Sequence, residues 1–142
     1  MTLRDKVVEE ARSWLNTRWV HQGRTRQGID CAGLIVVVGR KFDILDYDDK
    51  TNYQRRTAGL SFLKPFRESM RRKSFNERKP GDVVLFRDAH FPCHSTIYTA
   101  NEGIETIVHA TILERKVVEE RLQRGDWLQR VVACFEYKGI DN

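Results

Sequence analysis

The C-terminal half of the chain is a series of short β-rich runs separated by turn residues, and no other feature of the sequence constrains the fold as strongly. The runs are rich in β-branched and aromatic residues, which favour strands, and the turn "KPGD" at 79–82 opens them. Before this turn, apolar residues recur at helical spacing. Helices followed by strands are typical of an α+β domain, so we predict that fold class. The predicted strands occupy residues 82–86, 95–99, 104–110, 115–120 and 131–137.

The N-terminal segment has the pattern of an amphipathic helix. Thr2 and Asp5 are placed as an N-terminal capping pair. A further helix is predicted at 61–70, although Pro65 interrupts its pattern. The chain has the usual length of one domain, so we predict a single domain over residues 1–142. The apolar face of the first helix comprises Leu3, Val7, Ala11, Trp14 and Leu15.

The composition is that of an ordinary globular protein, with 40% apolar and 32% charged residues. No apolar run approaches the roughly 20 residues that a membrane-spanning helix needs, so we expect no membrane insertion. Residues 1–15 are charged throughout and lack the apolar centre of a signal peptide. We therefore expect synthesis in the cytoplasm without a signal peptide.

The formal net charge is +5, and the densest basic cluster is the segment "MRRKSFNERK" at 70–79. Clustered Lys and Arg attract phosphates and other anionic polymers. The segment precedes a predicted strand and reads as a solvated connection, which favours an ordinary basic surface. Attraction to an anionic cell-wall polymer and contact with nucleic acid are the alternatives, and we expect no nucleic-acid partner.

The chain has three cysteines, an odd number without a C-x-x-C spacing, which predicts free thiols rather than disulfides or a zinc site. Asp30 is a suitable N-cap, and the apolar run after Cys31 is long enough for a buried helix. A thiol in the first turn of a helix lies near unpaired backbone N–H groups and the positive end of the helix dipole, which favour the thiolate. Cys31 is therefore a candidate nucleophile, and a small buried structural cysteine is the alternative.

Two histidines are placed to become neighbours. His94 begins one predicted strand and His109 ends the next. If these strands form an antiparallel hairpin around "ANEG" at 100–103, the start of one lies beside the end of the other. A base held by a further polar group is the arrangement that activates a nucleophile. Cys31, His94 and His109 are thus the candidate catalytic residues.

The remaining histidines and the cysteine next to His94 have other predicted places. His21 lies in a loop upstream of Cys31 and is expected to line a substrate groove, whereas His90 reads as a loop residue. Successive strand residues point to opposite faces, so the thiol of Cys93 is expected to point away from the site.

The motifs "GIDCAGLI", "KPGDVVLF", "HSTIYTANEGIETIVHA" and "RKVVEERLQRGDWLQRVVACFEYKG" resemble those of NlpC-type cell-wall cysteine peptidases, and more narrowly the small phage-tail members of that family. The resemblance runs from about residue 5 to residue 138. It implies a reduced papain-like α+β fold, with the nucleophile at the N-terminus of a helix packed on an antiparallel sheet. It also implies cleavage of peptidoglycan stem peptides, typically between D-glutamate and a diamino acid. In that reaction Cys31 is the nucleophile, His94 the general base and His109 the orienting residue.

Three positions depart from the family pattern. Trp19 stands where the family commonly has a tyrosine, and it offers an N–H but no hydroxyl. Ala32 replaces the usual serine after the cysteine, a small change that should leave the chemistry intact. Thr96 stands where the family usually has a glycine, and we expect its side chain to narrow the groove. We expect Trp19, His21 and Asp30 to contact substrate, and the mechanism needs no metal or cofactor.

The resemblance makes bacterial peptidoglycan the expected substrate and phage tail-tip or hub proteins the expected partners. Because the sequence reads as having no export signal, we expect the protein to reach the cell wall as part of a phage tail, in the virion. Two alternatives remain. One is a catalytically silent structural or plug module of a tail tip, and the other is a different papain-like activity, such as an amidase or acyltransferase.

Overall fold

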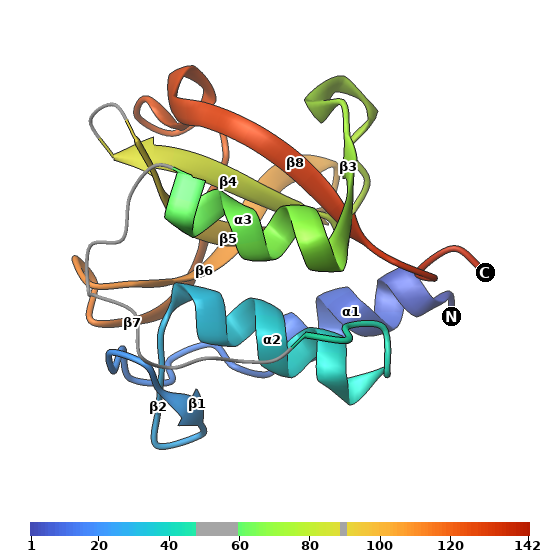
Figure 1. The fold of residues 1–142 in the computed structure, drawn as a ribbon. Coiled ribbons are helices and arrows are strands. Elements are labelled where there is room, and N and C mark those ends of the chain that lie inside the picture. Colours follow the sequence, from blue (N-terminus) through green and yellow to red (C-terminus); the bar gives the residue numbers. More distant parts are fainter. Residues whose placement is uncertain (48–59, 89–90) are drawn as a thin grey trace.

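The computed structural model describes residues 1–47, 60–88 and 91–142 of the chain. Helices cover one face of a six-stranded antiparallel sheet (Figure 1). The helices are α1 (Leu3–Arg12), α2 (Cys31–Lys41) and α3 (Leu60–Ser69). The strands of the sheet are β3 (Met70–Lys73), β4 (Val83–Asp88), β5 (Phe91–Asn101), β6 (Ile104–Thr111), β7 (Lys116–Arg121) and β8 (Val131–Tyr137).

The first helix begins where the sequence predicts. The Thr2 hydroxyl accepts from the Asp5 N–H at 3.1 Å, and the Asp5 carboxylate accepts from the Thr2 N–H at 2.9 Å. This reciprocal pair satisfies two backbone donors that a helix start would otherwise leave open. The helix then buries Val7, Val8 and Ala11.

Helix α2 lies at the centre of the helical layer and is almost wholly apolar. Its run of valines would favour a strand by propensity alone, but burial of Leu34, Ile35 and Val38 among the other helices and the sheet favours the helix. A short hairpin of β1 (Arg24–Thr25) and β2 (Gly28–Ile29) leads into the helix. The sequence did not predict this hairpin because each strand has only two residues.

The sheet has the strand order β3-β8-β4-β5-β6-β7, and every neighbouring pair is antiparallel. All five predicted strands are confirmed as β4 to β8. The helix predicted at 61–70 is confirmed as α3, which includes Pro65.

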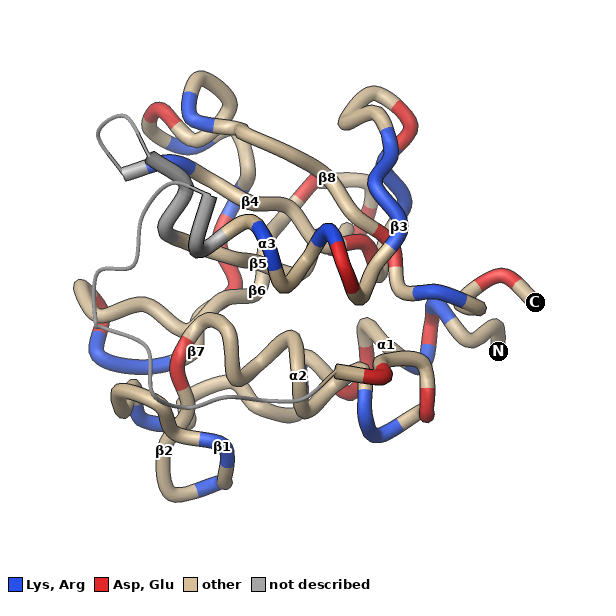
Figure 2. The backbone as a smooth tube through the Cα atoms, viewed as in Figure 1, with Lys and Arg blue, Asp and Glu red and all other residues tan. Residues whose placement is uncertain are grey.

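The interpretation of the basic segment at 70–79 as a solvated connection is wrong for its first residues. Residues 70–73 form β3 and pair with β8 at one edge of the sheet (Figure 2). Met70 is buried, and Lys73 pairs with the buried carboxylate of Asp82 at 2.9 Å. Alternation of buried and exposed residues over so few positions is too short a signal to recognise among so many charges.

The two faces of the sheet carry separate cores. The face toward the helices contributes Val83, Leu85 and Ile97 to the main core. The opposite face carries a smaller apolar cluster, covered by a 3-10 helix over Trp127–Arg130. That cluster comprises Val84, Phe86, Tyr98, Ile107, Leu122 and Cys134. Among the described residues, none of the helices is both long and apolar enough to cross a membrane.

Candidate active site

Cys31 is the first residue of α2, and its position is fixed by the residues around the helix start. The Asp30 side chain caps the helix by accepting from the Gly33 N–H at 2.8 Å. A Cβ on residue 33 would lie 2.5 Å from the carbonyl oxygen of Gly23, so glycine is required for the close approach of this loop. The predicted N-cap is confirmed, and the thiol lies in the first turn, where backbone N–H groups lack helical acceptors.

The Cys31 thiol lies against β5. Part of the residue is open to solvent, while protein groups surround its sulfur. The backbone N–H and the hydroxyl of Ser95 interact with the thiol, as does the N–H of Ala32. Because Ser95 directly follows His94 in the chain, the thiol lies next to the strand position that carries the candidate base.

The β5–β6 hairpin brings His94 and His109 together, as the sequence predicts. The two-residue turn consists of Glu102 and Gly103, both with positive φ, which suits the right-handed twist of the strands. His94 Nε2 lies 2.7 Å from His109 Nδ1, and the two rings meet edge to face with centroids 4.9 Å apart. The pair therefore shares one hydrogen bond.

A carboxylate on the next strand continues this chain of hydrogen bonds. His109 Nε2 lies 2.7 Å from Glu120 Oε1. The hydrogen bond to His109 lowers the pKa of Glu120, although burial opposes the shift. The sequence analysis did not identify Glu120. Alternation places it on the face of His109 only once the register of β7 against β6 is known, because Ile107 pairs with Glu120 and shares a face with His109.

Trp127 covers the two histidines. Its ring is stacked against that of His94 at 5.9 Å and meets the ring of His109 edge on at 5.4 Å. It also packs edge on against Phe86 at 4.8 Å. A lone tryptophan in the C-terminal segment gives no sequence signal for this role, because only the fold brings it over the hairpin. The aromatic cover keeps water from the hydrogen bonds between the rings.

The titration of the candidate dyad differs from the sequence-based expectation. Burial raises the pKa of Cys31, and the negative charge of Asp30 adds to the effect, while the groups of Ser95 and Ala32 oppose it. Burial, followed by the charges of His109 and Arg130, holds the pKa of His94 well below its usual range. Removal from water penalises both charged forms more than the helix start favours the thiolate. These shifts favour the neutral thiol of Cys31 and the neutral imidazole of His94.

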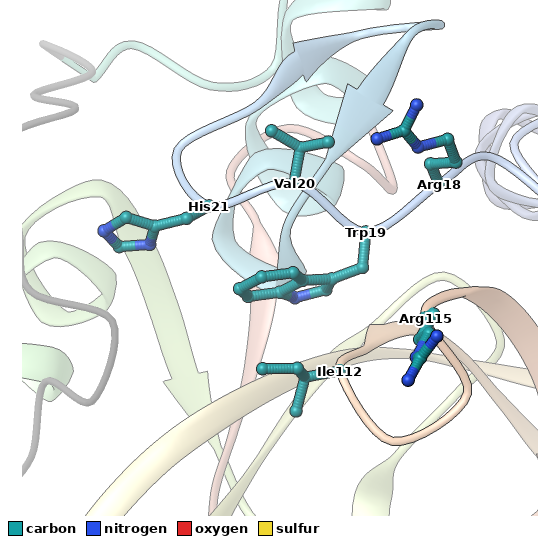
Figure 3. A pocket seen from close by; sticks show the side chains of 6 residues that line it. All are labelled: Arg18, Trp19, Val20, His21, Ile112 and Arg115. Atoms are coloured by element: carbon teal, nitrogen blue, oxygen red, sulfur yellow. The ribbon is translucent and has the colours of Figure 1, made fainter.

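Trp19 and His21 line a hollow of about 650 Å³ (Figure 3). The two rings are stacked with centroids 6.4 Å apart. The Trp19 indole faces Ile112 across the hollow, and Arg18 and Arg115 lie at its rim. The backbone N–H of Trp19 donates to the Arg115 carbonyl at 2.9 Å, which ties the loop before α2 to the turn between β6 and β7.

Asp30 has a different place from the substrate contact that the sequence analysis expected. Its side chain is 3% exposed. Besides capping α2, its carboxylate accepts from the Gln22 N–H at 2.8 Å and from Arg24 at 3.0 Å. Asp30 thus holds the loop that carries Trp19 and His21 against the start of α2. His90 and the side chain of Cys93 lie outside the described residues, so the predictions for them stay predictions.

Residues 16–136 match the family described as NlpC/P60. The chain belongs to the NlpC/P60 family. Its members are generally cysteine peptidases and endopeptidases that act on peptidoglycan. A curated relative, the probable endopeptidase NlpC of Escherichia coli, is 28% identical over 127 residues, which are 86% of this chain and 73% of the relative.

Solved structures of NlpC/P60 proteins share the fold. An NlpC/P60 family protein from Bacillus cereus superposes with a TM-score of 0.73 at 14% identity over 94% of this chain. This chain spans 40% of the length of that protein. The NlpC/p60 domain of the peptidoglycan hydrolase SagA gives a TM-score of 0.67 at 18% identity, covering 94% of this chain and 97% of the domain. These likenesses confirm the expected reduced papain-like α+β fold.

Proposed function

We propose that this NlpC/P60 protein is a cysteine endopeptidase that cleaves the stem peptides of peptidoglycan through Cys31, His94 and His109. The observation that carries the proposal is the juxtaposition at β5. The thiol at the start of α2 lies against Ser95, while the adjacent His94 is held by His109 at 2.7 Å. A nucleophile beside a base whose other ring nitrogen is held by a polar group is the arrangement of nucleophilic catalysis.

The proposed reaction is acyl transfer in two steps. His94 takes the thiol proton on the ring nitrogen that does not face His109, and the Cys31 sulfur attacks the scissile carbonyl. The His94 imidazolium then protonates the departing amine as the C–N bond breaks, which leaves a thioester. Water, deprotonated by His94, attacks the thioester and releases the acid and the thiol. The backbone N–H of Cys31 faces the oxyanion, and one such donor contributes about 3 kcal/mol.

The hollow lined by Trp19 and His21 supports a peptide substrate that carries carboxylates. Trp19 and Ile112 offer an apolar contact, and the exposed Arg18 and Arg115 bring positive charge to the same hollow. Stem peptides are short and carry free carboxylates next to the bond that the family typically cleaves. We propose that these arginines bind such carboxylates and that the cleaved bond joins D-glutamate to the diamino acid.

Digestion of purified peptidoglycan tests the proposed activity directly. Peptidoglycan sacculi of known composition are incubated with the wild-type protein and with Cys31→Ala, and the fragments are analysed by mass spectrometry. The expected result is release of fragments cut between D-glutamate and the diamino acid by the wild type alone. Cys134→Ala is the matched control, because this thiol is buried in the smaller core on the far face of the sheet. Equal fragment patterns for the wild type and Cys31→Ala would refute the proposal.

We further propose that the protein acts as a phage tail component, with tail-tip or hub proteins as its partners. The support is the likeness of its motifs to the small phage-tail members of the family. Mass spectrometry of purified virions should detect the protein, and its absence from them would count against the proposal. A catalytically silent plug is the alternative, and it predicts virions that contain the protein together with sacculi that it leaves intact.

A further inference from the structure

We propose that Glu120 is a positioning residue of the site, which selects the tautomer of His109 and through it the tautomer of His94. The inference rests on the proposed function, because it assigns a role within the same reaction. It extends the candidate site by one member, from Cys31, His94 and His109 to Glu120. The chain of contacts crosses three neighbouring strands, from β5 through β6 to β7.

The sheet places Glu120 for this contact. His109 pairs with Val118 across β6 and β7, so Glu120 lies one diagonal step from His109 on the same face. A diagonal separation is within reach of a glutamate side chain. His109 is 1% exposed and Glu120 is 24% exposed, so the hydrogen bond between them is largely shielded from water. The Trp127 indole also donates to the Glu120 carboxylate, which holds its position.

The hydrogen-bonding capacity of a carboxylate decides the tautomers. An ionised carboxylate only accepts, so Nε2 of His109 must carry the proton that it donates to Glu120. Nδ1 of His109 is then an acceptor, and it accepts a hydrogen bond from the N–H at Nε2 of His94. Nδ1 of His94 is left without a proton, as a base for a thiol must be.

Without the carboxylate, the same two rings could bond in the opposite sense. His109 would carry its proton on Nδ1 and donate it to Nε2 of His94. Since Nε2 of His94 would then be an acceptor, the proton of the His94 ring would be on Nδ1. In that arrangement Nδ1 of His94, the ring nitrogen that does not face His109, could not accept a proton from the thiol. Both arrangements satisfy the 2.7 Å contact between the rings, and Glu120 distinguishes them.

The charge of Glu120 also supports the protonated state that the reaction passes through. When His94 takes the thiol proton, the positive charge lies one ring away from the carboxylate. The other charged groups near this chain are Arg124, which faces Glu120, and Arg130, whose charge disfavours protonation of His94. Asp30 acts on the thiol from the start of α2. Among the residues that the structure describes, Glu120 is thus the carboxylate that contacts the histidine pair.

The neighbouring residue provides a matched control. Glu119 points to the other face of β7, where it holds Arg12 of α1 at 2.9 Å and accepts from Thr106 at 2.8 Å. Glu119→Gln therefore removes one carboxylate from the same strand without touching the histidines. Any effect on folding or on the strand itself is reproduced by this variant, whereas an effect on the tautomers is not.

The first experiment reads the tautomers in solution, where no substrate is needed. ¹⁵N-labelled wild type, Glu119→Gln, Glu120→Gln and Glu120→Asp are compared by long-range ¹H–¹⁵N correlation of the histidine rings. In the wild type and in Glu119→Gln, both His94 and His109 should carry their proton on Nε2. In Glu120→Gln the Nδ1-protonated form of His109 should appear, because an amide can donate as well as accept. A proton on Nδ1 of His109 in the wild type would overturn the inference.

The second experiment follows peptidoglycan cleavage as a function of pH. Glu120→Gln should lower kcat roughly 10- to 100-fold, by analogy with the loss that follows when the carboxylate that orients a metal-ligating histidine is removed. Loss of the negative charge should also move the acid limb of the pH–rate profile to lower pH, because the protonated form of His94 becomes less favourable and its pKa falls. Glu120→Asp keeps the charge on a shorter side chain and should restore part of kcat and the position of the limb.

The two experiments separate the inference from the proposed function. A wild type that cleaves nothing but shows the expected tautomers, altered only in Glu120→Gln, refutes the proposed activity and supports the role of Glu120. An active wild type in which Glu120→Gln behaves like Glu119→Gln in tautomers, kcat and acid limb overturns the role of Glu120. Cooperative thermal unfolding of each variant, followed by circular dichroism, shows that the compared proteins are folded.

Discussion

The hydroxyl of Ser95 is fully buried, and the polar group that it faces is the thiol of Cys31. Among the described residues, its oxygen has no hydrogen-bond partner of ordinary geometry. A buried hydroxyl without a hydrogen bond is costly, whereas a hydroxyl that can donate to a thiolate stabilises the charged form. Ser95 therefore opposes the effect of burial on the Cys31 thiol.

Replacing Ser95 by alanine should slow the reaction of Cys31 with iodoacetamide near neutral pH. A hydrogen bond to a charged group is worth about 1.5–3 kcal/mol, so the rate should fall about tenfold or more. Thr96→Val is the matched control, because the Thr96 hydroxyl donates to the Val84 carbonyl at 3.0 Å and not to the thiol. Equal alkylation rates in Ser95→Ala and the wild type would contradict the assigned contact.

The pH dependence of cleavage should be an unusually broad bell. Catalysis needs one proton shared by Cys31 and His94. The pair gains a second proton below the pKa of His94, which burial lowers, so the acid limb lies below about pH 6.5. The pair loses its last proton above the pKa of Cys31, which burial raises, so the basic limb lies above about pH 8.5. Initial rates of kcat/KM between pH 5 and about pH 10 test the width.

Alkylation of Cys31 should follow a different curve, because it needs the thiolate alone. Its rate should rise along a single curve centred above the ordinary value of a cysteine, without a fall at high pH. His94→Ala should leave that curve nearly unchanged, since the imidazole is already neutral where the thiol ionises. A plateau of fast alkylation reaching down to pH 6 would instead reveal a resting thiolate–imidazolium pair. It would contradict a raised pKa of Cys31 and a lowered pKa of His94.

His109 should matter less than His94, because it orients the base and does not exchange a proton with substrate. His109→Ala should lower kcat by less than His94→Ala does. His109→Gln should retain part of the activity, since its amide can accept from His94 and donate to Glu120 at once. Steady-state kinetics of the three variants test this order. The roles need revision if His109→Ala is as inactive as His94→Ala and His109→Gln recovers nothing.

The part of the site that the sequence predicts is the part set by local rules. Asp30 caps α2 because an acidic residue before an apolar run is a strong helix start. His94 and His109 meet because an antiparallel hairpin with a two-residue turn fixes which residues are neighbours. Both rules use spacing alone, so they need no knowledge of the packed core.

The part that the sequence does not predict depends on burial and on the third strand. The titration of Cys31 and His94 is set by how much protein surrounds them, and no spacing rule gives that quantity. Glu120 belongs to the site only because the register of β7 against β6 puts it on the face of His109, and a slip of one residue would move it to the other face. Trp127 covers the histidines from a segment that precedes β8, far from them in sequence.

Trp19 should contribute to binding more than to chemistry. Trp19→Ala should raise KM for a stem peptide several-fold with a smaller change in kcat, because it removes the apolar wall opposite Ile112. Trp19→Tyr should keep KM near that of the wild type, since a phenol preserves the aromatic face. Leu113→Ala is the control, because Leu113 lies beside Ile112 in the same turn but outside the hollow. An unchanged KM in Trp19→Ala would remove Trp19 from the substrate groove.

The ion pairs of Arg4 should contribute strongly to the stability of the fold. Its guanidinium binds Asp82 at 2.8 Å and Asp141 at 2.7 Å, which ties α1 to the start of β4 and to the C-terminus. The Asp82 side chain is 0% exposed, so Arg4→Ala leaves a buried carboxylate with Lys73 as its remaining ionic partner. Removing one partner of a buried pair typically costs about 3 kcal/mol or more. Lys64→Ala breaks an exposed pair with Glu68 at 3.9 Å and should cost less than about 0.5 kcal/mol. Urea unfolding of both variants compares the two costs, and equal midpoints would show that the Arg4 network adds nothing to stability.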